Sequence, residues 1–190
     1  MKQPLRAIFW IVVYFLLVFA PLIILLIGPR QVGREFWREF SVALGFAGLS
    51  LMGLQFLPTA RLPLMADVFP MDAVYSFHHK MSLASLALVA AHPLILFLNN
   101  PFTLRLLNVF TAPGRARAGT LALLAMVILV LTSVRRKQIG IQYESWRGVH
   151  IVCTVAAAVL ALVHLFGVRY HTANPAQRAL WIAMPALWLL

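Results

Sequence analysis

Acidic residues are scarce in this chain, which has 5 Asp and Glu among 190 residues against 16 Lys and Arg. A carboxylate-based ion site or proton relay inside a membrane needs Asp or Glu within the apolar segments. The five acids lie instead near the ends of apolar runs, at Glu35, Glu39, Asp67, Asp72 and Glu144. Their positions argue against a carboxylate-based pump or channel.

Cysteine is almost absent as well. The single Cys153 excludes an internal disulfide and a cysteine-rich zinc or iron–sulfur site. The sequence also has no phosphate-binding loop, no Gly-rich dinucleotide fingerprint and no nucleophile–base–acid pattern. We therefore assign no catalytic side chain.

Apolar residues dominate, at 62% of the chain with a mean hydropathy of +0.88, whereas soluble domains are about half apolar. This predicts an integral membrane protein in contact with lipid. The net charge of +11 does not indicate nucleic acid, because the basic residues sit in short loops between apolar runs. The run from Ile8 to Ile27 is too long for a signal peptide and predicts an uncleaved first span.

A membrane-spanning helix needs about 20 mostly apolar residues, and six runs qualify as candidates. They cover residues 7–27, 36–57, 73–98, 119–134 and 143–168, with a sixth that begins near 178 and is cut short at 190. Pro21 predicts a kink in the first span, and the short run 102–110 predicts an interfacial segment. We expect an all-α six-helix bundle that forms one domain over 1–190, with a C-terminal continuation completing the sixth helix.

The loop charges do not fix the orientation, since eight basic residues fall on each side of the membrane. The cluster Arg135–Lys137 favours cytoplasmic termini. We expect a multi-pass protein of the bacterial inner (plasma) membrane.

Two histidine pairs with identical spacing carry the functional prediction. His78 and His92 are fourteen residues apart in the third run, and His150 and His164 are fourteen apart in the fifth. Fourteen residues fall only about 40° short of four helical turns, so each pair lies along one helix face, about 21 Å apart. Imidazole is rare within membranes unless it has a function.

The two helices run in the same direction because one span separates them. His78 then shares a depth with His150, and His92 shares a depth with His164. Two imidazoles facing each other at each of two depths suit bis-histidine ligation of haem. Zinc fits less well, since it prefers four ligands around one ion.

Small or medium side chains occupy the faces between the histidines, and we expect them to leave clearance for a macrocycle. They are Ser82, Ser85 and Val89 on the third span, and Thr154, Ala157 and Ala161 on the fifth. Close helix packing also favours small residues, so this feature discriminates only together with the histidines.

Three other residues are alternatives or additions to this set. His79 competes with His78, but lies about 140° away from the face of His92. His171 follows His164 by seven residues and is either an ordinary loop histidine or a group near an electron acceptor. Arg147 is either a partner for haem propionates or an interfacial anchor beside Trp146.

The motifs around these histidines resemble a known family. Phe77-His78-His79-Lys80-Met81 followed by His92-Pro93, and Tyr143-Glu144-x-Trp146-Arg147-x-x-His150 followed by His164, are similar to the third and fifth helices of the ferric reductase and NADPH oxidase superfamily. Phe36-Trp37-Arg38-Glu39 resembles the start of its second helix. Ser82 stands where the family often has Gly.

The resemblance implies two b-type haems, one bound by His78 and His150 towards the cytoplasm and one by His92 and His164 towards the outer side. Electrons would pass from a cytoplasmic flavin, fed by NAD(P)H, to ferric iron or dioxygen outside. FAD and NAD(P)H would belong to a missing C-terminal region or to a flavin dehydrogenase partner. Two alternatives stay open: a haem-binding subunit of a separate periplasmic reductase system, and a non-redox histidine-lined metal-ion transporter.

Overall fold

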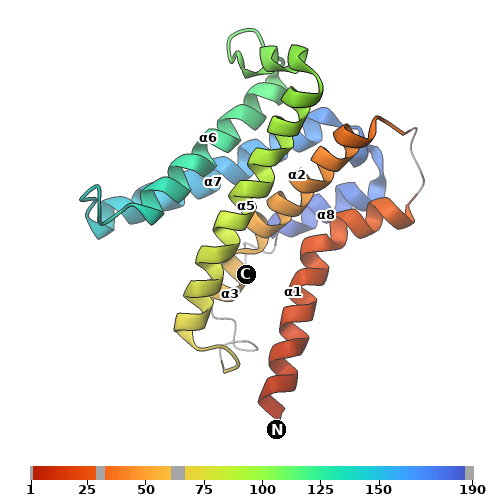
Figure 1. Cartoon of the computed structure of the whole chain (residues 1–190). Helices are drawn as coiled ribbons and strands as arrows, with labels where there is room; N and C mark the ends of the chain where they lie inside the picture. The colour runs from red at the N-terminus through yellow and green to blue at the C-terminus, as the bar shows by residue number, and fades with distance from the viewer. Residues whose placement is uncertain (1, 29–32, 61–66, 187–190) are drawn as a thin grey trace.

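The computed structural model describes residues 2–28, 33–60 and 67–186, and every regular element in these ranges is helical. The long helices are α1 (Lys2–Ile27), α2 (Phe36–Leu54), α5 (Met71–Asn99), α6 (Gly114–Val134) and α7 (Tyr143–Val168) (Figure 1). Shorter elements connect or follow them: α3 (Phe56–Thr59), η1 (Pro101–Leu107), η2 (His171–Ala173) and α8 (Pro175–Ala186).

Five helices are long and apolar enough to cross a membrane, and they coincide with the first five predicted spans. Many large apolar side chains on them point outward, including Phe9, Leu26 and Val152, which suits contact with lipid rather than water. Together these features indicate an integral multi-pass membrane protein. The predicted sixth span corresponds to α8, whose 12 described residues are too few to cross a bilayer.

The bundle is built from two tightly packed helix pairs. α2 lies along α5 and α6 lies along α7, and these are the most extensive helix contacts in the described chain. α5 and α7 carry the four histidines, yet their backbones approach each other far less closely. α5 is therefore supported mainly by α2, and α7 mainly by α6.

Glycine at the α2–α5 contact explains how closely those helices pack. A methyl group added at Gly48 would lie 2.7 Å from Cγ2 of Val89. The Ser85 hydroxyl donates a 2.7 Å hydrogen bond to the Gly48 carbonyl across the same contact. Small residues at this crossing allow the two backbones to approach, as is common between membrane helices.

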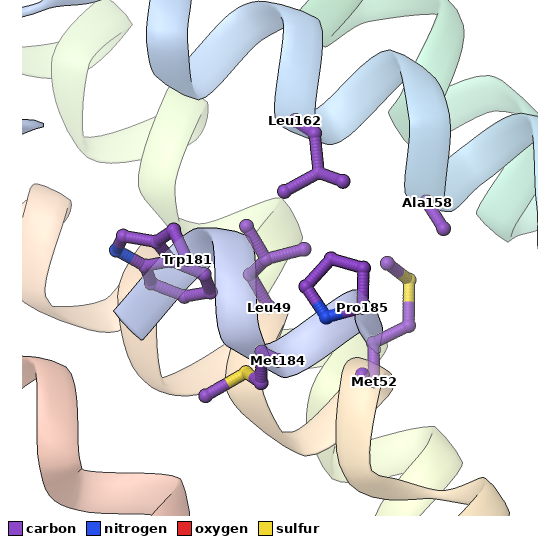
Figure 2. A pocket seen from close by; sticks show the side chains of 8 residues that line it. Leu49, Met52, Ala158, Leu162, Trp181, Met184 and Pro185 are labelled. Atoms are coloured by element: carbon purple, nitrogen blue, oxygen red, sulfur yellow. The ribbon is translucent and has the colours of Figure 1, made fainter. Parts of the chain in front are cut away.

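The first and last helices close one side of the bundle. α1 bends towards its C-terminal end (Figure 1), and it contains Pro21, at which the sequence predicts a kink. The buried Gln177 side chain of α8 donates a hydrogen bond to the Pro21 carbonyl. Trp181 of α8 is also buried, beside a cavity of about 20 Å³ that Leu49 and Leu162 help to line (Figure 2).

Candidate haem site

The structure brings the four predicted histidines together in two pairs. The rings of His78 and His150 have their centroids 6.4 Å apart, and those of His92 and His164 are also 6.4 Å apart. Each pair takes one ring from α5 and one from α7. His79 is exposed, which agrees with the preference for His78.

These separations would allow the two rings of each pair to bind one metal ion. Imidazole nitrogen binds first-row metals at about 2.0–2.1 Å, which places the centroids of two opposed rings about 6 Å apart. Among the described residues no cluster of three or more His, Cys, Asp or Glu side chains could hold a metal ion. Two protein ligands suit a porphyrin iron, which has four ring nitrogens of its own, better than they suit zinc.

Both histidines of one pair bond to a backbone carbonyl through Nδ1. Nδ1 of His92 lies 3.0 Å from the Ser41 carbonyl of α2, and Nδ1 of His164 lies 2.7 Å from the Arg115 carbonyl of α6. A carbonyl only accepts, so the hydrogen sits on Nδ1 and the Nε2 lone pair is free. Metal-binding histidines are commonly oriented in this way.

Glycine lies four residues after each of these carbonyls. A methyl group on Gly45 would come 3.3 Å from Cγ of His92, and one on Gly119 would come 2.7 Å from Nδ1 of His164. The rings of His92 and His164 therefore pack against the helix backbone at Gly45 and Gly119, where no side chain intervenes. We call Ser41 with Gly45, and Arg115 with Gly119, the two carbonyl–glycine seats.

His150 in the other pair is oriented by a side chain instead. Its Nδ1 lies 3.2 Å from the Ser133 hydroxyl of α6. That hydroxyl donates its one hydrogen to the Leu129 carbonyl at 2.7 Å and accepts a hydrogen bond from Trp146 Nε1 at 3.2 Å. Its remaining lone pair accepts from Nδ1 of His150, which again leaves Nε2 free.

His78 is the least constrained of the four. The backbone of Gln55 lies close to its ring, but no hydrogen bond of good geometry reaches Nδ1 from the described residues. The side-chain amide of Gln55 is likewise buried without a partner among them. The two histidine pairs thus differ in how firmly the protein orients them.

The expected clearance between α5 and α7 is wrong for two of the named residues. Ser85 and Val89 turn to Gly48 of α2, so their small size serves helix packing. The hydroxyls of Ser82 and Thr154 bond back to the carbonyls of His78 and His150, each at 2.7 Å.

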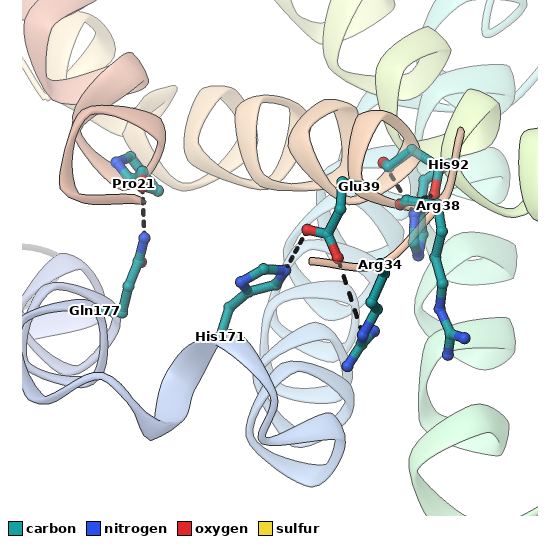
Figure 3. A network of polar contacts seen from close by, with 8 residues as sticks. Pro21, Arg34, Arg38, Glu39, His92, His171 and Gln177 are labelled. Carbon is teal, nitrogen blue, oxygen red and sulfur yellow. Dashed lines mark hydrogen bonds and ion pairs between the residues drawn. The ribbon is translucent and has the colours of Figure 1, made fainter. Parts of the chain in front are cut away.

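The other two residues singled out in the sequence each lie near an acidic residue. Arg147 is exposed and lies 3.9 Å from Glu144. Nε2 of His171 lies 3.0 Å from a Glu39 carboxylate oxygen, and Arg34 lies 3.9 Å from the other oxygen (Figure 3). Burial lowers the pKa of His171 below 6.5, with Arg34 adding to this effect and Glu39 opposing it.

A larger cavity of about 230 Å³ lies between α1, α3 and the start of α5. Trp10, Tyr14, Phe69 and Phe77 contribute to its mostly apolar lining, and none of the four paired histidines lines it. The cavity is therefore separate from the two histidine pairs.

The described chain is thus a helical membrane protein in which four histidines from α5 and α7 lie in two pairs. The chain belongs to the family of ferric reductase like transmembrane components, whose family model matches residues 44–163. This range includes His78, His92 and His150 and ends one residue before His164. No curated protein and no solved structure matches the chain.

Membership in this family implies transmembrane electron transfer and an oxidoreductase in the general sense. The resemblance identified in the sequence is therefore confirmed. The sequence did not predict the two carbonyl–glycine seats or the role of Ser133. No sequence pattern specifies which backbone carbonyl or hydroxyl a distant histidine ring will contact.

Proposed function

We propose that this chain conducts electrons across a bacterial inner membrane through two b-type haems. His78 and His150 would bind one haem, and His92 and His164 would bind the other. The observation that carries the proposal is the pair of 6.4 Å ring separations between α5 and α7. Both fit opposed axial imidazoles, and they occur at the two depths that the fourteen-residue spacing sets.

When bound, the haem irons would supply the one-electron chemistry. The protein supplies four Nε2 donors, three of which have their tautomer fixed by a bond at Nδ1. Two histidines holding one haem iron would leave it no open position, which would favour electron transfer over binding of dioxygen at the metal. Any reduction of dioxygen would then occur outside the iron coordination sphere.

The donor and acceptor follow from the family resemblance. A flavin reduced by NAD(P)H would deliver electrons on the cytoplasmic side, from a continuation of this chain or from a separate dehydrogenase. Ferric iron or dioxygen would receive them on the outer side. A haem-binding subunit of a periplasmic reductase system is the alternative within the same chemistry.

Haem content of the purified protein tests the proposal directly. We expect a red protein with two haems per chain and a sharp Soret band that shifts on reduction with dithionite. His79→Ala is the matched control, because His79 is exposed beside His78 and should leave both haems bound. A colourless protein that binds zinc would instead support the transporter alternative.

A further inference from the structure

The carbonyl–glycine seats repeat the same arrangement on two different helices. In each, a ring Nδ1 meets the carbonyl of residue i, and the residue at i+4 is glycine: Ser41 with Gly45 on α2, and Arg115 with Gly119 on α6. In an α-helix the carbonyl of residue i points towards residue i+4. A side chain at i+4 therefore hinders a donor from another helix that would hydrogen-bond to that carbonyl.

The contact distances show that the two glycines differ in how strictly they are required. A Cβ atom at Gly119 would lie 2.7 Å from Nδ1 of His164, the nitrogen that bonds to the Arg115 carbonyl. A Cβ atom at Gly45 would lie 3.3 Å from Cγ of His92 and needs a smaller adjustment. Alanine at 119 thus displaces the hydrogen bond, while alanine at 45 strains it.

Such a bond does more than hold the ring. A carbonyl that accepts the Nδ1 hydrogen makes the imidazole more basic and a stronger donor to a metal at Nε2. Stronger donation favours ferric over ferrous iron and so lowers the reduction potential of a haem. The His78–His150 pair has only the shared Ser133 hydroxyl and no such carbonyl with good geometry among the described residues.

We propose that Gly45 and Gly119 are positioning residues that give His92 and His164 their carbonyl partners and thereby lower the reduction potential of the haem between them. This inference rests on the proposed function. Neither glycine would bind the iron. The two glycines would nevertheless set the reduction potential of the His92–His164 haem and not that of the other haem.

Single-haem backgrounds make the test unambiguous. In the full chain carrying His78→Ala, only the haem of His92 and His164 should remain. Adding Gly119→Ala should shift its midpoint potential to more positive values in a spectroelectrochemical titration, and Gly45→Ala should shift it less in the same direction. In the His92→Ala background, where the other haem remains, Gly119→Ala should leave the potential unchanged.

Gly48→Ala is the matched packing control. It also creates a 2.7 Å clash on α2, but with Val89 and not with a histidine, so it should leave the potential unmoved. If Gly119→Ala prevents folding or haem binding, the milder Gly45→Ala supplies the measurement.

Unmoved potentials in both glycine variants, or an equal shift in Gly48→Ala, would overturn the inference while the two-haem protein stands. A wild-type chain that binds no haem overturns both the inference and the proposed function.

Discussion

The two histidine pairs have the same ring separation but different surroundings. His92 and His164 each bond to a backbone carbonyl and rest against a glycine. His150 shares a serine hydroxyl with Trp146, and Nδ1 of His78 has no partner of good geometry among the described residues. Equal spacing along two helices therefore produces two sites of equal width but unequal rigidity.

The largest expected effect comes from removing one ring of either pair. His92→Ala and His150→Ala should each reduce the haem content from two to one per chain, because the two sites share no ligand. Pyridine haemochrome analysis of the purified variants measures this ratio. Loss of both haems from a variant that still folds would contradict the independence of the sites.

A smaller effect should distinguish the hydroxyl-supported pair. Ser133→Ala removes the acceptor for both His150 Nδ1 and Trp146 Nε1. Leaving a fully buried donor unpaired costs about 1–3 kcal/mol, and the lower end applies here because both residues are half-buried. We expect a corresponding loss in the free energy of unfolding in detergent, together with a changed spectrum of the His78–His150 haem only.

Thr132→Ala is the control for that substitution. Within the described ranges, the hydroxyl of Thr132 bonds only to the carbonyls of Ile128 and Leu129 on its own helix. We therefore expect a change within about 0.5 kcal/mol. Equal losses from the two substitutions would show that Ser133 does not support His150.

The smallest expected effect is a pH dependence of stability that arises from His171. Because burial lowers the pKa of His171, the unfolded chain binds a proton there before the folded chain does. This contribution to stability is complete above about pH 6.5 and is lost as the pH falls through the lower folded-state pKa. Wild-type protein should thus lose more stability on acidification than His171→Gln, as measured by thermal unfolding between pH 8 and 5.

Glu39→Gln sharpens the same measurement. The Glu39 carboxylate raises the pKa of His171 and so opposes the effect of burial. Removing its charge should lower that pKa further and increase the loss of stability in acid. An unchanged pH profile in both variants would mean that His171 does not contribute to it.

Sequence periodicity was sufficient to predict which histidines face each other. The fourteen-residue spacing and the parallel course of the third and fifth spans depend only on helix geometry and on one intervening span. The choice of His78 over His79 followed from the same angular argument, and the structure places His79 at the surface. Apolar run length likewise predicted five of the six spans.

Contacts between different helices were not predictable in the same way. Ser85 and Val89 were expected to leave clearance beside α7, yet they contact α2, because helix rotation within a bundle depends on all neighbours at once. The seats at Ser41 and Arg115 use backbone carbonyls, which every residue has, so side-chain chemistry gives no sign of them. The glycines at 45 and 119 were visible in the sequence, but their partners were not.

The division of the bundle into an α2–α5 pair and an α6–α7 pair has a consequence for biogenesis. Each helical hairpin contributes one imidazole to each depth, so neither half can saturate an iron alone. If the proposed function holds, stable haem binding requires that the α2–α5 pair and the α6–α7 pair have both inserted into the membrane and packed against each other. Haem binding would then occur only after assembly of the bundle is complete. It would also connect two helix pairs that otherwise make few contacts with each other.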